Sequence, residues 1–284
     1  MRPEAIMALL SARDGAEWHL CGPCSGGEVG AWRACRPDGS QVVFKWVEGR
    51  DNGDLGRSVE LIGRLRAAGY PIAQYDDVAQ LPGVAVVIQA FVEGGRVLDK
   101  VTHRLLDRLL ELNATQSGRG GGPSRWRELM THSLAEGEDG YCVHETLRQH
   151  GSGTSVLLQE IEAIGAILAP RLAQAEDVVH YDFHHRNILQ DGDDVVAVID
   201  WEGCRPGDRI FDLVTLETCL IAAETDPGVA ARLRRQIATE GDADAVAVYV
   251  AHMSLRMVDW SLRHHPDEIE MWLGSARARL DALG

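Results

Sequence analysis

The sequence predicts an α+β protein with a small β-rich lobe at its N-terminus and a larger helical lobe after it. Short strand-like runs bounded by turn residues fill residues 1–92, and helical periodicity dominates residues 93–284. One short β patch interrupts the helical part. A chain of 284 residues has the length at which a single hydrophobic core stops growing and a division becomes favourable. We therefore expect two domains that meet near residue 92.

The first lobe is expected to hold a five-stranded sheet with one main helix, after a short helix over residues 4–12. Apolar residues recur at helical spacing over residues 55–68, and Gly69 and Pro71 end that helix. Residues 36–40 form a turn, because Pro37 presets φ and Gly39 tolerates a positive φ. The strands are expected at residues 18–21, 29–35, 41–47, 73–78 and 84–90.

The second lobe is expected to be helical apart from one β-hairpin. The acidic turn at residues 191–194 separates two short strand-like runs, 187–189 and 195–199. The glycine-rich residues 118–122 indicate a flexible loop inside this lobe. Helices are expected at residues 98–115, 124–135, 143–149, 155–173, 210–223, 227–238, 242–265 and 267–283.

The charge of the chain excludes some classes of partner. Lys and Arg number 28 against 43 Asp and Glu, so the formal net charge is −15. Such an excess repels nucleic-acid phosphates and acidic membrane surfaces, and it attracts cationic small molecules. The N-terminus lacks the apolar core of a signal peptide, and no apolar run reaches the length of a membrane span. We expect a cytoplasmic monomer or weak dimer.

The chemistry is concentrated between Val178 and Leu213. Asp182, Asn187 and Asp200 lie there at the ends of apolar runs, where a rigid scaffold commonly places site residues. An amide oxygen and a carboxylate are hard donors that suit Mg²⁺. This pattern predicts a magnesium site at Asn187 and Asp200, and it leaves Asp182 to orient a hydroxyl group.

The spacing HxDxxxxN resembles the aminoglycoside phosphotransferase family and, more remotely, protein kinases. Its residues here are His180, Asp182 and Asn187, and Asp200 lies in Ile-Asp-Trp-Glu, a sequence typical of the family. Residues 207–213 match the family's Gly-Asp…Asp-Leu segment. The resemblance covers nearly the whole chain. It implies a protein-kinase-like bilobal fold and an ATP- and Mg²⁺-dependent transfer of phosphate to a small-molecule hydroxyl.

The resemblance also implies a nucleotide site in the first lobe. Lys45, in the strand-like run around residues 41–47, matches the lysine that holds the α- and β-phosphates, and Glu60 matches its helix partner. Gln89 and Phe91 occupy the hinge position, where backbone groups bind adenine. Ser25, Gly26 and Gly27 lie in a loop whose backbone N–H groups are expected to approach a phosphate.

The remaining site residues are expected in the second lobe. Asp182 is the expected catalytic base, and His184 and Arg186 are expected near the transferred phosphoryl group, with a structural salt bridge as the alternative for Arg186. His180 and Asp212 are expected to brace the loop. Four carboxylates are expected to bind a cationic acceptor: Glu136, Asp139, Glu202 and Asp259.

Two departures from the family pattern narrow the function. Tyr181 stands where the family commonly has Gly, and only 11 residues separate Asp200 from Asp212, which leaves no room for the activation loop of a protein kinase. The acceptor is therefore expected to be a small molecule. A cationic antibiotic fits the charge best, either an aminoglycoside or a basic cyclic peptide of the capreomycin and viomycin type. A macrolide or a choline-like amine remains open.

The sequence also bears on two other classes of function, a non-catalytic pseudokinase and a thioredoxin-like oxidoreductase. A non-catalytic pseudokinase would typically lack the lysine, the base or a metal ligand, and none of these is lost here. Cys21-Gly22-Pro23-Cys24 matches the motif of thioredoxins. That chemistry needs the first cysteine at a helix N-terminus, and the glycines at 26 and 27 disfavour a helix there. We therefore expect a kinase.

Overall fold

The computed structural model describes residues 1–24, 30–48, 53–122, 124–138, 140–226 and 228–283. The chain divides into two compact units. Unit 1 comprises Met1–Thr115 and His184–Cys204, and unit 2 comprises Gln116–Phe183 and Arg205–Gly284. The expected boundary near residue 92 thus falls inside unit 1. The chain returns to unit 1 after Phe183, which sequence periodicity does not reveal.

Unit 1 is built on an antiparallel sheet of five strands, as the sequence predicts. Its order is β1-β2-β3-β5-β4, so β5 and β3 are central and β1 and β4 lie at the edges. The strands are β1 (His19–Pro23), β2 (Trp32–Cys35), β3 (Gln41–Glu48), β4 (Tyr75–Leu81) and β5 (Val84–Ala90). The helices are α1 (Pro3–Asp14), α2 (Gly53–Ala67) and α3 (His103–Thr115).

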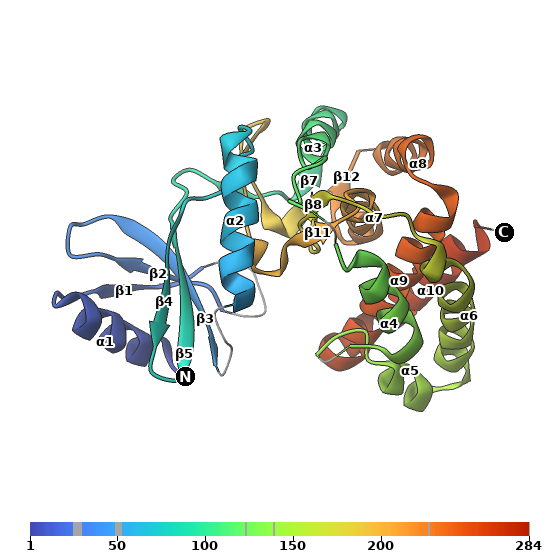
Figure 1. Cartoon of the computed structure of the whole chain (residues 1–284), viewed down its shortest axis with the longest axis horizontal. Helices are drawn as coiled ribbons and strands as arrows, with labels where there is room; N and C mark the ends of the chain where they lie inside the picture. Colours follow the sequence, from blue (N-terminus) through green and yellow to red (C-terminus); the bar gives the residue numbers. More distant parts are fainter. Residues whose placement is uncertain (25–29, 49–52, 123, 139, 227, 284) are drawn as a thin grey trace. The chain divides into compact units, whose positions relative to one another are not determined.

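The alternation of side chains along β5 explains how two helices cover this sheet. Val84, Val86 and Ile88 pack in one cluster with Ile6 and Leu10 of α1. The intervening Ala85 and Val87 pack with Leu55 of α2. Successive residues of a strand point to opposite faces, so α1 covers one face of the sheet and α2 the other (Figure 1).

A second, three-stranded sheet in unit 1 carries the expected hairpin. Its order is β10-β9-β6, and its strands are β6 (Arg96–Val97), β9 (Ile188–Asp191) and β10 (Asp194–Val198). Val198 N–H donates to the Pro71 carbonyl over 2.7 Å, which ties this hairpin to the segment before β4. Two short 3₁₀ helices flank it: η2 (His185–Asn187) and η3 (Trp201–Gly203). Another short strand, β7 (Lys100–Val101), precedes α3.

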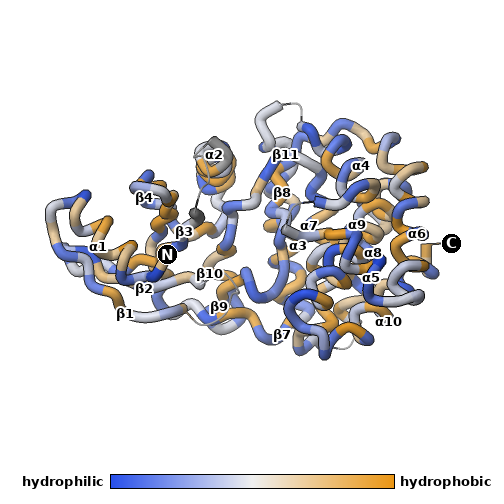
Figure 2. Tube along the Cα trace, turned by 90° about the horizontal axis from the view of Figure 1, so that it is seen from below, coloured by the Kyte–Doolittle hydropathy of each residue, from blue (hydrophilic) through white to orange (hydrophobic). Residues whose placement is uncertain are grey.

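Unit 2 is mainly helical, and its longest helix is α9 (Ala243–His264). The others are α4 (Trp126–Glu136), α5 (His144–His150), α6 (Ser152–Leu168), α7 (Ile210–Cys219), α8 (Val229–Glu240) and α10 (Ile269–Asp281). Helix α9 packs against α4, α5, α6, α7 and α10, and hydrophobic and hydrophilic residues are mixed along these helices (Figure 2). The short elements are η1 (Ala169–Arg171), η4 (Leu220–Ala222), η5 (Pro266–Glu268), β8 (Asp177–Val179), β11 (Arg205–Gly207) and β12 (Glu224–Thr225).

A close approach in unit 2 explains the glycine of the Gly-Asp segment. β11 pairs with β8, and a Cβ at Gly207 would lie 2.5 Å from the fully buried ring of Trp126. Only glycine fits there, so the core fixes the chain just before α7. Within the described part of the chain, no helix has both the length and the apolar character to cross a membrane.

Candidate active site

Unit 1 contains a charged centre that joins the two sheets. Lys45 lies in β3, and its Nζ is 2.7 Å from Asp200 Oδ1 and 3.8 Å from Glu202 Oε2. Asp200 follows β10 and adopts φ = 70°, a left-handed conformation that starts η3. Trp201 N–H donates to the Tyr75 hydroxyl over 3.2 Å and so anchors this turn to β4. One ammonium group therefore faces two carboxylates.

Glu202 lies beside Lys45, which sequence reasoning did not expect. Glu60, the expected partner of Lys45, is exposed on α2. The physical reason lies in the orientation of α2: its Ser58 is buried against the carbonyls of Glu202 and Cys204. Glu60 is two residues further along the helix and therefore points away from that contact. Glu202, expected at the acceptor site, belongs to the charged centre of unit 1.

The environment of Glu202 suits a cation. The pKa of its carboxyl group is raised to about 7. Burial is the main cause, Lys45 opposes the rise, and the neighbouring Asp200 adds to it. Both carboxylate oxygens are buried and make no hydrogen bond to any described residue. The unsatisfied Glu202 oxygens lie next to the Asp200 carboxylate, and together the two groups form a hard-donor set that fits Mg²⁺.

The backbone of Asn187 contacts the segment that carries Asp200. Its carbonyl accepts a hydrogen bond from Ile199 N–H over 2.9 Å, one residue before Asp200. His184 Nδ1 accepts from Arg186 N–H and so caps η2, and His184 Nε2 is 3.3 Å from the Asn187 amide. Arg186 is exposed. His184 therefore shapes the turn that presents Asn187.

The structure describes the residues of the expected adenine contacts but not the loop residues expected to approach a phosphate. Gln89 is buried near the end of β5, and Phe91 N–H donates to the Gln41 carbonyl over 3.1 Å. That N–H is thus already paired inside unit 1, and the adenine contacts stay a prediction. Ser25, Gly26, Gly27 and Asp139 lie outside the described residues.

Unit 2 contains a second charged centre, at Asp182. Arg256 of α9 donates from one guanidinium nitrogen to Asp182 Oδ1 over 2.8 Å and from another to the Tyr181 carbonyl over 2.7 Å. The Asp182 side chain is 36% exposed and that of Arg256 only 19%. One arginine therefore holds two consecutive residues of the loop while the carboxylate stays accessible.

Tyr181 adopts a backbone conformation that L-residues rarely take, with φ = 75°. Its ring stacks on Phe211 at a centroid separation of 5.2 Å, and the Arg205 guanidinium lies 4.0 Å from the ring centre. Its hydroxyl is 3.2 Å from His252 Nε2 and donates to Glu138 over 3.3 Å. These contacts form an aromatic cage that stabilises the unusual conformation. The cage accounts for a tyrosine where the family commonly has glycine.

Asp212 braces the same loop from α7. Its carboxylate is fully buried and accepts hydrogen bonds from His180 N–H, Tyr181 N–H and Gln116 Nε2 over 2.7–3.0 Å. Burial raises the pKa of Asp212 to about 7, and these donors oppose that rise. The His180 ring accepts from Asp182 N–H over 3.2 Å. Both residues expected to be structural thus contact the backbone next to Asp182.

Two of the carboxylates expected to bind the acceptor have other surroundings. Asp259 is fully buried, accepts two hydrogen bonds from Arg263, and accepts a third from Thr146 over 2.7 Å. Arg263 balances its charge inside unit 2, so we do not propose Asp259 as a ligand of the acceptor. Glu136 is exposed at the end of α4, 3.7 Å from His132.

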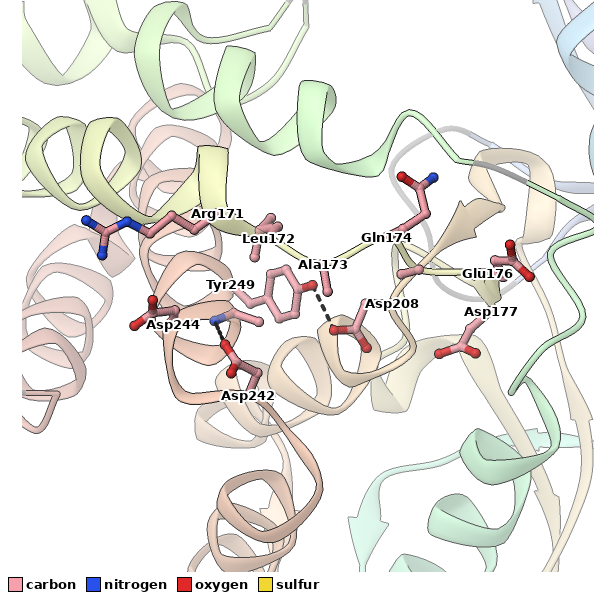
Figure 3. Close-up of a pocket in the computed structure, with 12 residues that line it drawn as sticks. Arg171, Leu172, Ala173, Gln174, Glu176, Asp177, Asp208, Asp242, Asp244 and Tyr249 are labelled. Atoms are coloured by element: carbon pink, nitrogen blue, oxygen red, sulfur yellow. Dashed lines mark hydrogen bonds between the residues drawn. The ribbon is translucent and has the colours of Figure 1, made fainter.

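Unit 2 has an acidic pocket with a volume of about 420 Å³. Figure 3 shows residues that line it, and two of its carboxylates serve the local structure. Asp208 accepts from the Tyr249 hydroxyl over 2.9 Å and from Ile210 N–H at the start of α7. Asp242 caps α9 by accepting from Ala245 N–H. Burial raises the pKa of Asp208. These bonds assign both residues a structural role.

The fold and the two charged centres define a protein-kinase-like phosphotransferase of small molecules. The sequence model of the phosphotransferase enzyme family matches residues 36–249. The chain therefore belongs to that family. A comparison with curated protein sequences finds no match.

Solved structures agree on the fold at low sequence identity. Aminoglycoside phosphotransferase APH(4)-Ia is 15% identical with a TM-score of 0.74, over 99% of each chain. Amicoumacin kinase hAmiN is 16% identical with a TM-score of 0.65, over 99% of this chain and 96% of that one. A choline/ethanolamine kinase family protein from Mesorhizobium loti is 16% identical with a TM-score of 0.62, over 99% and 92%.

Proposed function

We propose that this enzyme transfers the γ-phosphoryl group of ATP to a hydroxyl of a small cationic antibiotic and thereby confers resistance. The observation that carries the kinase chemistry is the 2.7 Å pair of Lys45 and Asp200 in unit 1. Structures similar in fold were solved with ADP, AMP-PNP, hygromycin B or amicoumacin. These complexes support ATP as donor and an antibiotic as acceptor.

The residues of unit 1 act on the donor. Lys45 neutralises phosphate oxygens, and Asp200 and Asn187 hold Mg²⁺, with the Glu202 carboxylate beside them. The bound ion neutralises charge on the phosphates. Without a nucleotide, Asp200 holds the Lys45 ammonium close to where those phosphates bind. Phosphoryl transfer needs little more than such positioning and charge neutralisation.

The residues of unit 2 act on the acceptor. Asp182 orients the attacking hydroxyl and accepts its proton, and the partly exposed carboxylate has the access that this role needs. Arg256 fixes the direction of the carboxylate, and the braced backbone around Tyr181 fixes its position. His184 and Arg186 are retained as candidates for contacts with the transferred group.

Two observations support a cationic acceptor: the net charge of −15 and the antibiotics bound in structures of similar fold. Asp259 does not support it, because its carboxylate is already paired with Arg263. The cationic antibiotic is an aminoglycoside or a basic cyclic peptide. A small amine of the choline type is the second candidate, because one protein of similar fold belongs to the choline/ethanolamine kinase family. A macrolide is tested beside them.

The test is acceptor-dependent ADP release across a panel of aminoglycosides, capreomycin, viomycin, a macrolide and choline, with the phosphorylated product identified by mass spectrometry. We expect a cationic antibiotic to give the highest kcat/KM. Its KM should rise between about 50 and 500 mM salt, because added salt screens the attraction. Tight binding of Mg·ATP without turnover on any acceptor would instead establish a pseudokinase.

A further inference from the structure

We propose that Cys21 and Cys35 form a reversible disulfide across β1 and β2 when the protein meets a low-molecular-weight disulfide. Their sulfur atoms are 3.2 Å apart in unit 1, and both thiols are free. A disulfide bond is about 2.05 Å long, so closure needs an approach of only about 1 Å. This modification site is separate from the residues of the proposed reaction.

The register of the two strands brings both cysteines to the same part of the hairpin. His19 pairs with Cys35, Cys21 is two residues beyond His19, and the 3.2 Å separation of the sulfur atoms shows that the two side chains meet. The register shifts between Leu20 and Gly22, which pair with Ala34 and Arg33. Cys21 is therefore the extra residue of a β-bulge. A bulge releases a residue from the regular ladder and redirects its side chain.

The pairing differs from the one that the Cys-Gly-Pro-Cys sequence suggests. Residues 21–23 belong to β1, and Cys24 N–H donates to the Ala31 carbonyl, which continues the hairpin. The segment is therefore a strand and not the helix N-terminus that thioredoxin chemistry needs. Cys24 and Cys35 are both half-buried, so exposure does not separate them, but the sulfur of Cys35 lies 3.2 Å from that of Cys21. Cys35 is thus the better partner for Cys21.

The reaction is thiol–disulfide exchange. The exposed Cys21, as the thiolate, attacks one sulfur of the small disulfide, forms a mixed disulfide and releases one small thiolate. The Cys35 thiolate then attacks the Cys21 sulfur and releases the second one. The two cysteines lose two electrons and two protons, and the small disulfide becomes two thiols. A dithiol reductant reverses both steps.

The test exposes the full chain to oxidised glutathione, blocks the remaining thiols with N-ethylmaleimide and maps the tryptic peptides. Trypsin cuts after Arg33, so Cys21 and Cys24 stay in one peptide and Cys35 falls in the next. We expect the two peptides to be cross-linked and dithiothreitol to separate them. An intact link between Cys21 and Cys24, or six alkylated cysteines after oxidation, would overturn the proposal.

Two matched variants identify the partners. Cys24→Ser should keep the cross-link, whereas Cys35→Ser should stop the reaction at a glutathione adduct on Cys21. Loss of the cross-link in Cys24→Ser would assign the bond to Cys24 and Cys35 and would contradict the proposal. Phenylarsine oxide provides a check without oxidation, because it releases one water when it bridges two neighbouring thiols. It should bind once to the wild type and to Cys24→Ser, and not to Cys35→Ser.

Discussion

Helix α9 carries two arginine–aspartate pairs that differ in one property. Arg256 contacts Asp182, and Arg263 contacts Asp259, each at a shortest distance of 2.8 Å. Asp182 belongs to a loop and is 36% exposed, whereas Asp259 lies in α9 itself and is completely buried. The two pairs have the same shortest distance, so pair geometry does not separate them, whereas exposure does. Only the Asp182 carboxylate is open to solvent and therefore has the access that the proposed role as base needs.

Asp182→Asn tests the accessible carboxylate and should have the largest effect. The amide keeps the shape and a hydrogen bond to Arg256 but accepts no proton from the acceptor. We expect kcat to fall by about 10²–10⁴ while the affinity for Mg·ATP stays within about twofold. Steady-state kinetics and nucleotide titration measure the two quantities. A variant that keeps more than about a tenth of the wild-type kcat would remove Asp182 from the role of base.

Arg263→Met tests the buried pair. It leaves the Asp259 carboxylate without its ionic partner inside the protein, and such a change typically costs about 3 kcal/mol of unfolding free energy. Urea denaturation measures this loss. Since Asp259 does not contact the acceptor in our proposal, kcat of the folded fraction should stay within about twofold. A selective loss of kcat with unchanged stability would reverse the roles of the two pairs.

Arg256→Met tests whether Arg256 positions Asp182. A freely rotating carboxylate orients the hydroxyl less often, so we expect kcat to fall by about 10- to 100-fold with an unchanged KM for Mg·ATP. Arg256→Lys keeps the charge and one hydrogen bond and should recover part of kcat. Equal losses in both variants, accompanied by a lower melting temperature, would indicate that Arg256 serves only the fold.

Asp259→Asn should have the smallest effect of the four. The amide oxygen still accepts from Thr146 and from one Arg263 nitrogen, but the amide NH₂ group cannot accept from the other, so one hydrogen bond and the ionic part of the contact are lost. Because Arg263 is itself 26% exposed, water compensates for much of that loss. We expect about 1 kcal/mol of destabilisation by urea denaturation, without a change in acceptor KM. A several-fold rise in that KM would restore Asp259 as an acceptor ligand.

Local patterns in the sequence predicted the sheet and the motif, because both depend on near neighbours. The apolar run at residues 84–90 and the acidic turn at residues 191–194 belong to single elements. The boundary of the units depends on β6 pairing with β9, more than 90 positions later, which no local pattern indicates. The expected boundary near residue 92 therefore leaves His184–Cys204 in the second lobe, although this segment belongs to unit 1.

The candidate site residues fall into two groups, those that a local motif indicates and those that depend on packing. The short motif indicates Asp182, Asn187 and Asp200. The proximity of Lys45 and Glu202 instead depends on how α2 packs against η3. Arg256 is 74 positions from Asp182. Its only sequence signal is a charged residue amid the buried residues of α9, at seven-residue spacing from Tyr249 and Arg263. That signal indicates an internal ion pair without naming its partner.

The cage around Tyr181 limits the order in which substitutions can accumulate at this loop. Replacing Tyr181 by Gly relieves the positive φ, worth about 1 kcal/mol, but removes a buried ring, which typically costs about 3–5 kcal/mol. It also leaves Arg205 and Phe211 without the ring between them. A glycine is thus tolerated only after its neighbours have been remodelled. Residues 181, 205 and 211 are therefore bound to change together, and a related sequence with glycine here should differ at the other two positions.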